Sequence, residues 1–220
     1  DDTLWAFSLN ARDTYEEMYW KYGYDRYFDS FEHYYLLYQR RNLDLWAEYA
    51  DGKVTKEELN RQRYLYPLEA VGAGDSTLAK AYERDALTMI PTKSKLMPHA
   101  REVLEYLSGK YNLYIHSNGF KELNSHKMRS SGIDEYFKKV VLSDDIGILK
   151  PWPEIFHFAL STTQSELNNS LMIGDSWEND IVGAAGVGMH QVFYNLSGRT
   201  DLPFAPTYQI TDLKDLFNFL

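Results

Sequence analysis

Two carboxylates in the second half of the chain have a spacing that could bind a metal ion. Asp175 follows a short apolar run that ends in glycine, Leu171–Gly174, which is the pattern of a buried parallel strand entering a turn. Asp180 lies near the start of a helical run. Ligands bind at the carboxyl ends of strands in open α/β sheets, and paired oxygen donors suit a hard cation, so the two acids predict a Mg²⁺ site. A structural role remains open for both, with Asp175 turning the chain and Asp180 capping a helix.

Polar residues also follow two other expected strands. Ser117-Asn118-Gly119 comes directly after an apolar segment and offers a hydroxyl and backbone N–H groups to an anion, although the same triplet is a common turn. Lys150, fixed by Pro151, could reach a phosphate as a point charge, although most single lysines are solvated. Asp1-Asp2-Thr3 resembles the loop after a strand, so we expect the sequence to begin inside an element.

Helices rich in aromatic residues are expected from about Ala11 to Ile90. Tyrosine, tryptophan and phenylalanine recur there at helical spacing, which is typical of helices packed on one another. Asp51-Gly52 ends one helix, and Thr55 forms a capping-box signature for a helix that should run to Arg63 or Tyr64. This segment is predicted to be a small helical domain.

Beyond Pro98, short apolar strands alternate with helices, which predicts right-handed βαβ units and a parallel sheet. We therefore expect an α/β fold with two domains. Residues 1–11 and 92–220 would form a Rossmann-like core, and residues 12–91 an inserted helical cap. The expected strands are 113–115, 140–142, 171–173, 191–193 and 208–210, and the expected helices are 99–107, 122–131, 153–160, a run ending at 187 and one from 213.

The amino-acid composition excludes several classes of function. Hydrophobic residues make up 44% of the 220 residues and charged residues 25%, as in ordinary globular domains. The absence of cysteine excludes disulfides and thiolate chemistry, and a net charge of −9 argues against binding to a nucleic-acid polymer. A small phosphorylated substrate remains compatible with local cations. No apolar run could span a bilayer and no secretory signal opens the sequence, so we expect no membrane partner, a cytoplasmic location and a monomer or homodimer.

The order of these motifs resembles that of the haloacid dehalogenase-like (HAD) hydrolases, and specifically their phosphatases with a helical cap. Asp1-Asp2-Thr3 is similar to the end of the first family motif, Ser117 to the second and Lys150 to the third. Asp175 with Asp180 is similar to the fourth. The resemblance covers essentially the whole chain, because the helical segment falls where the family inserts its cap.

The resemblance implies a role for each residue. Asp1 would be the general acid and base and would offer its backbone carbonyl to the metal; Ser117, with the N–H groups of Asn118 and Gly119, would bind the phosphoryl oxygens. Lys150 would offset negative charge next to the nucleophile. Asp175 and Asp180 would hold Mg²⁺. This division suits phosphoryl transfer, which depends on positioning and charge stabilisation.

The family nucleophile is an aspartate two residues before Asp1, outside the printed sequence. We expect the sequence to begin late, because a sheet without its central strand would leave strands unpaired. A second departure is His116, which stands where an apolar residue or threonine is expected and which we interpret as half-buried and hydrogen-bonded.

Within the phosphatases, the chain looks like the bacterial pyrimidine 5′-nucleotidase branch, which implies nucleoside 5′-monophosphates as substrates. The alternatives are a phosphatase of sugar phosphates or another small ester, a metal-independent 2-haloacid dehalogenase, and a non-catalytic phosphate-binding relative. The acids at Asp1, Asp175 and Asp180 argue against the dehalogenase. The nucleotidase-like segments are 42–49, Gly52, Thr55, Arg63, 118–120 and 147–151.

Overall fold

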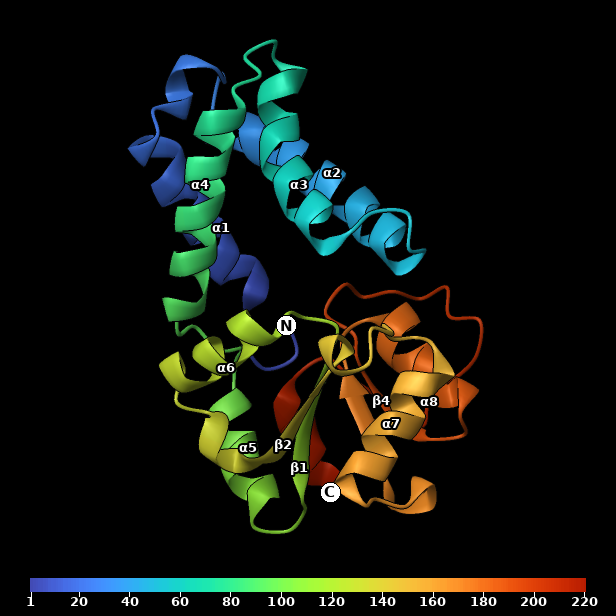
Figure 1. Ribbon diagram of the computed structural model, residues 1–220. Helices are drawn as coiled ribbons and strands as arrows, with labels where there is room; N and C mark the ends of the chain where they lie inside the picture. Colours follow the sequence, from blue (N-terminus) through green and yellow to red (C-terminus); the bar gives the residue numbers. More distant parts are fainter. The chain divides into compact units, whose positions relative to one another are not determined.

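The computed structural model describes residues 1–220, which divide into two compact units (Figure 1). One unit combines Asp1–Phe7 with Ser94–Leu220, and the other is the continuous segment Ser8–Lys93. The boundaries between the two units, at 7/8 and 93/94, lie a few residues from the expected boundaries at 11/12 and 91/92. We call the first the core unit and the second the cap unit; the domain assignment itself stays a prediction.

The cap unit is helical, as the sequence indicated. Three of its four helices are preceded by residues whose side chains accept hydrogen bonds from the first turn: Ser30 from the His33 N–H, Thr55 from the Glu58 N–H, and Asp75 from the N–H groups of residues 77 and 78. The third helix runs past its expected end at Tyr64 and through Pro67, because Leu65 and Leu68 are buried on the same face. The helices are α1 (Phe7–Lys21), α2 (Phe31–Ala50), α3 (Lys56–Ala70) and α4 (Ser76–Met89), with 3₁₀ turns at Tyr24–Arg26 and Ile90–Thr92.

Tyrosines form the centre of the cap unit. Six of them are almost completely buried, and the rings of Tyr24 and Tyr82 are stacked with centroids 4.9 Å apart. Tyr38 is also buried, and its ring is tilted against that of Tyr15 with centroids 4.5 Å apart. The Tyr15 and Tyr38 hydroxyls are 2.6 Å apart and share a hydrogen bond. Most of the aromatic excess therefore packs helices against one another. The six fully buried tyrosines are Tyr15, Tyr19, Tyr24, Tyr34, Tyr64 and Tyr82.

The core unit contains five parallel strands in two separate sheets. β1 pairs in parallel with β2, and β3 pairs with β4, which pairs with β5. No strand joins β1 to β3, so the sequence correctly predicted an α/β fold with parallel strands, but they do not form one continuous sheet. The strands are β1 (Leu113–Ser117), β2 (Phe137–Leu142), β3 (Leu171–Gly174), β4 (His190–Tyr194) and β5 (Tyr208–Ile210).

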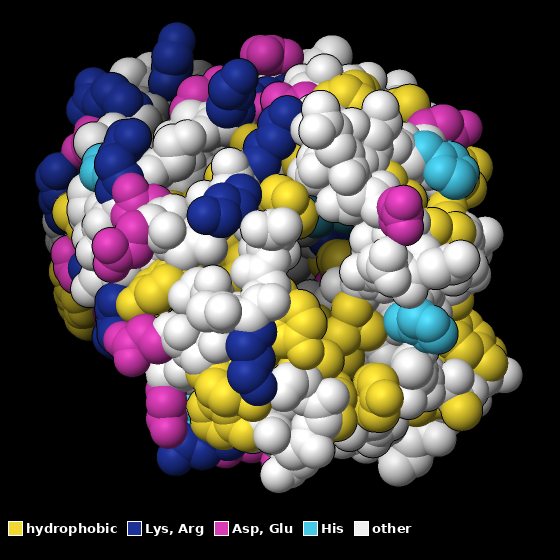
Figure 2. Space-filling model, turned by 90° about the horizontal axis from the view of Figure 1, so that it is seen from below, with side chains coloured by type: hydrophobic (Ala, Val, Ile, Leu, Met, Phe, Trp, Pro, Cys, Tyr) yellow, Lys and Arg dark blue, Asp and Glu magenta, His cyan; other side chains and the backbone are white.

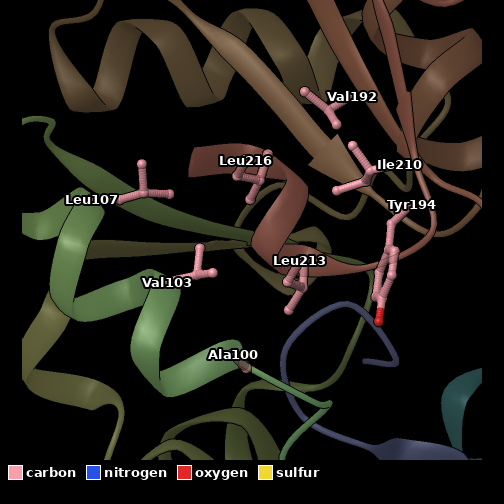
Figure 3. Packing of buried hydrophobic residues seen from close by; sticks show 8 residues of the cluster. All are labelled: Ala100, Val103, Leu107, Val192, Tyr194, Ile210, Leu213 and Leu216. Atoms are coloured by element: carbon pink, nitrogen blue, oxygen red, sulfur yellow. The ribbon is translucent and has the colours of Figure 1, made fainter. Parts of the chain in front are cut away.

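Helices cover these sheets. In Figure 1, α5 (Ala100–Ser108) and α6 (Lys121–Ser130) lie on the side of β1 and β2, whereas α7 (Pro153–Thr163) and α8 (Gly183–Gly186) lie on the side of β4. The C-terminal 3₁₀ segment, Leu213–Asn218, replaces the expected α-helix. Its residues pack with α5, β4 and β5 in one apolar cluster (Figure 3), and the partly buried Leu113 of β1 packs against this cluster. The cluster contains Ala100, Val103, Leu107, Val192, Tyr194, Ile210, Leu213 and Leu216. No helix is both long enough and apolar enough to cross a membrane.

Candidate active site

The turn after β3 places both acids of the fourth motif. Asp175 directly follows the strand, and the chain then enters a six-residue π-helical turn, Trp177–Val182, where the sequence had suggested an ordinary α-helix. Ser176 caps this turn, because its Oγ accepts the Asn179 N–H at 3.2 Å. Asp180 points back, so that its Oδ2 accepts the Ser176 N–H at 3.1 Å. π-turns are rare and are frequently found at functional sites.

Gly174 leaves the space that Asp180 occupies. A Cβ built on Gly174 would overlap with Oδ2, Cγ and Cβ of Asp180. The fourth motif therefore needs its glycine for close packing, independently of any turn conformation.

Lys150 forms an ion pair with Asp180 in the interior of the core unit. Its Nζ lies 2.5 Å from Asp180 Oδ1 and donates to the His116 carbonyl oxygen at 2.9 Å. Lys150 is 7% exposed and Asp180 5%. Buried charges persist only when they are paired in this way, so the third and fourth motifs are linked physically as well as by their order in the chain.

The side chain of Asn118 holds the backbone of Lys150. Its Nδ2 donates to the Lys150 carbonyl at 3.0 Å, and its Oδ1 accepts the Lys150 N–H at 2.7 Å. The Lys150-Pro151 peptide bond is cis. The sequence suggested only the N–H group of Asn118 as functional, whereas its side chain fixes the loop that carries the lysine.

Ser117 and Gly119 form a compact turn at the carboxyl end of β1. The Gly119 N–H donates to Ser117 Oγ at 3.0 Å. A Cβ on Gly119 would lie 2.6 Å from Asn124 Nδ2 and 3.2 Å from Ser117 Oγ, so a larger residue would displace both side chains. Ser117 is therefore held in place beside the Lys150 loop.

The first-motif loop lies against the fourth motif. The Thr3 hydroxyl donates to Asp175 Oδ1 at 2.5 Å. A tight turn holds the loop, with the Thr3 N–H on the Asp1 carbonyl at 2.7 Å and a positive φ of 52° at Asp2. Asp1 forms an ion pair with Lys127 of α6. Thr3 and Lys127 had no assigned role in the sequence interpretation.

Burial determines the protonation of several of these groups. It raises the pKa of the Asp175 carboxyl; the Thr3 hydrogen bond opposes this shift, and the charge of Asp180 adds to it. Burial and the nearby Lys150 charge lower the pKa of His116 to about 3, so this ring is neutral. Its Nε2 has no hydrogen-bond partner, which contradicts the expectation of a hydrogen-bonded histidine; the ring instead packs edge-on against Phe156 at 4.9 Å. Burial also lowers the pKa of Lys127 to about 7, so its charge depends on the acids around it.

A cavity of about 1060 Å³ separates β1 from β3. All residues of β1 and the first three residues of β3 line it, and Figure 2 shows a hollow in the face seen from below. All five predicted catalytic and metal-binding residues line it and meet at its carboxyl end: Asp1, Ser117, Lys150, Asp175 and Asp180. Interior parallel strands are normally buried on both faces, yet every residue of β1 is only half-buried, because this edge faces the cavity.

The acids are suited to a divalent cation without forming a closed cage. No group of three or more His, Asp or Glu side chains converges tightly enough to hold an ion by itself. Mg²⁺ does not require one, since it usually takes one or two carboxylates together with water and substrate oxygens. Asp175 is buried next to the negative charge of Asp180, and both effects disfavour its ionised form. The positive charge of a bound cation would offset both effects, so the two carboxylates fit a divalent cation.

A family model for haloacid dehalogenase-like hydrolases matches residues 1–188. The chain therefore belongs to this family of hydrolases, as its motif order suggested.

Two bacterial proteins illustrate the relationship within the family. The chain is 29% identical to the HAD-hydrolase YfnB of Bacillus subtilis over 187 residues, which are 83% of this chain and 78% of YfnB. It is also 29% identical to the pyrimidine 5′-nucleotidase YjjG of Escherichia coli over 185 residues, covering 83% of this chain and 80% of YjjG. A crystal structure of YfnB bound to magnesium matches all of this chain and 95% of that one, with a TM-score of 0.87 and 25% identity. A 2-haloacid dehalogenase from Pseudomonas syringae shares the fold, with a TM-score of 0.67 at 24% identity.

Proposed function

We propose that the protein is a Mg²⁺-dependent phosphomonoester hydrolase that acts on nucleoside 5′-monophosphates through an aspartyl-phosphate. The observation that carries the proposal is the meeting of Asp1, Ser117, Lys150, Asp175 and Asp180 at one end of one cavity. Hydrolysis of phosphate esters is supported by the relatives, which include pyrimidine 5′-nucleotidases and a phosphoserine phosphatase.

Each residue has a role that its surroundings permit. The Ser117 hydroxyl, with the N–H groups of Asn118 and Gly119, binds phosphoryl oxygens, and Lys150 offsets the charge that builds up on them. Mg²⁺, held by Asp175 and Asp180 with the Asp1 backbone carbonyl, would neutralise phosphoryl charge when bound. The Asp1 carboxyl donates a proton to the leaving oxygen and later takes one from water.

An aspartyl-phosphate requires a nucleophilic aspartate, which the family resemblance puts two residues before Asp1. Asp1 lines the cavity together with Lys150 and Ser117.

The substrate preference rests on the cap unit and on the relatives. Two of the relatives are named as pyrimidine 5′-nucleotidases. Most cap tyrosines are buried, but Trp46 and Tyr49 of α2 are only half-buried, with rings in an edge-on arrangement 5.9 Å apart. Stacking of a base on an aromatic ring contributes about 1–3 kcal/mol in nucleic-acid binding, which is enough to favour a nucleotide over a sugar phosphate.

The experiment compares kcat/KM of the full-length protein for uridine and thymidine monophosphates, sugar phosphates and 2-chloropropionate, with Mg²⁺ and with EDTA. Asp175→Asn should lower phosphatase activity about 10²-fold or more, the usual effect of removing one charge-stabilising group. Asp134→Asn, an exposed aspartate of the core unit, is the matched control and should leave it unchanged.

Each result bears on a separate part of the proposal. Phosphatase activity that persists in EDTA and in the Asp175 variant would refute the metal assignment. A tenfold preference for sugar phosphates, about 1.4 kcal/mol in transition-state binding, would refute the nucleotide preference alone. Halide release without phosphatase activity would favour the dehalogenase.

A further inference from the structure

Lys127 is a buried cation beside the site that none of the four motifs includes. It lies on the inner face of α6, between the buried residues Asn124 and Met128, and lines the same cavity as Asp1. Only 9% of its side chain is exposed. A buried lysine without a partner would lose its charge, so its position next to a carboxylate requires an explanation.

The contacts of Lys127 connect α6 to the first-motif loop. Its Nζ pairs with Asp1 Oδ1, 126 positions earlier in the chain, and lies 5.2 Å from the centre of the Trp5 ring. Trp5 is almost completely buried and is fixed by an antiparallel bridge to Leu96. At the other end, the Lys127 carbonyl accepts the Ser131 hydroxyl at 2.6 Å. The ammonium is therefore held between a ring and a carboxylate that both belong to this loop.

Lys127 is separate from the lysine that the motifs already contain. Lys150 is committed to Asp180 and to the His116 carbonyl. The two lysines thus divide the carboxylates between them, with Lys150 on the fourth motif and Lys127 on the first.

We propose that Lys127 is a positioning residue that fixes the carboxyl group of Asp1 for proton transfer to the leaving oxygen. The inference rests on the proposed phosphatase function. In the step concerned, the nucleophile forms a bond to phosphorus as the bond from phosphorus to the ester oxygen breaks. Asp1, protonated before this step, gives its proton to that oxygen and becomes the carboxylate that pairs with Lys127, and the alcohol leaves neutral. A general acid must lie within hydrogen-bond reach of its acceptor, and a contact from a buried, immobilised cation restricts where the Asp1 oxygens can be.

A role through Asp1 differs measurably from a role in stability. Esters with poor leaving groups, such as nucleoside 5′-monophosphates, need the proton, whereas 4-nitrophenyl phosphate releases a stable anion and hardly needs it. The parameter to compare is kcat/KM, because it covers the steps up to formation of the aspartyl-phosphate and excludes its hydrolysis, which is common to all substrates.

The experiment measures both substrates with Lys127→Met, which keeps the length and removes the charge, and Lys127→Arg, which keeps the charge. Arg129→Met removes an exposed cation from the same helix and is the control. We expect Lys127→Met to lose about 10–10² more in kcat/KM on uridine monophosphate than on 4-nitrophenyl phosphate, a part of the 10²–10⁴ that a general acid contributes. Lys127→Arg should show a smaller gap and Arg129→Met none.

Equal losses on the two substrates, or no loss, would overturn the inference while leaving the phosphatase proposal intact. A wild-type protein inactive on both substrates would instead refute the phosphatase proposal, on which the inference depends. If Lys127→Met does not fold, Lys127→Gln, which keeps a hydrogen-bond donor in the same space, provides the same comparison.

Discussion

The close contact between Gly174 and Asp180 predicts that adding one methyl group would damage the core unit. In Gly174→Ala, the new Cβ would overlap with the Asp180 carboxylate, which is held by Lys150 and by the Ser176 N–H. Overpacking a rigid interior costs about 1–3 kcal/mol, and breaking a buried ion pair by loss of one partner costs about 3–5 kcal/mol. The expected loss therefore begins at about 1–3 kcal/mol and increases if Lys150 loses its partner.

The assay is thermal unfolding followed by near-ultraviolet circular dichroism, with phosphatase activity measured in parallel. For a chain of this size, 1 kcal/mol corresponds to about 2–4 °C in Tm, so the core transition should fall by about 2–12 °C. Activity should fall as well, because Asp180 and Lys150 both belong to the proposed site.

Gly186→Ala provides the matched control. Gly186 is an exposed glycine of α8, and its Cβ would meet no atom within 4 Å. Alanine there should be neutral or add up to about 0.5–1 kcal/mol, since glycine is the poorer helix former. If Gly174→Ala had the stability and activity of Gly186→Ala, the proposed clash would be wrong.

Two further predictions concern buried polar groups. The pKa of His116 is about 3 in the folded protein and about 6.5 in the unfolded chain. As the pH drops below 6.5, only the unfolded chain gains a proton, so the free energy of unfolding decreases. Between pH 7 and pH 5 the loss of stability amounts to about 2 kcal/mol. In His116→Leu, the free energy of unfolding measured with urea should therefore depend less on pH by this amount. A pH dependence identical to that of the wild-type protein would contradict the burial argument. In the cap unit, Arg63 is 6% exposed and its Nε has no partner, while Nη2 donates to Asn60 at 2.5 Å and the guanidinium lies over the Tyr64 ring. Arg63→Met should therefore leave the Tm of the cap unit unchanged or raise it, and a loss above about 2 kcal/mol would reveal an interaction that we have not recognised.

The sequence predicted what depends on local pattern. Asp175 follows a strand, Ser117 is the last residue of another, and Thr55 caps a helix; each of these features depends on residues within a few positions. The family could be recognised because its motifs occur in a fixed order. The placement of the motifs at one edge then followed from the rules for parallel sheets.

The features that the sequence could not reveal depend on distant contacts or exact backbone geometry. Nothing in the local pattern indicates that Thr3 reaches Asp175 or that the Asn118 side chain binds the Lys150 backbone. The π-helical turn depends on Asp180 folding back to Ser176, which helical periodicity does not encode. A weak signal did exist for Lys127, because it lies three positions after Asn124 and next to Met128, on the buried face of α6.

The cap unit is inserted in the sequence between the two segments of the core unit, and this affects the order in which the protein can fold during synthesis. Thr3 and Asp175, which hydrogen-bond to each other, are 172 positions apart, and the loop-closure entropy of an open chain increases with that separation. The cap unit is continuous in sequence, from Ser8 to Lys93, and leaves the ribosome before β1. If it folds first, as N-terminal units generally do, the flexible loop between Asp1–Phe7 and the later strands is shortened by the whole length of the cap. A destabilised cap would then slow formation of the core unit without touching any of its contacts.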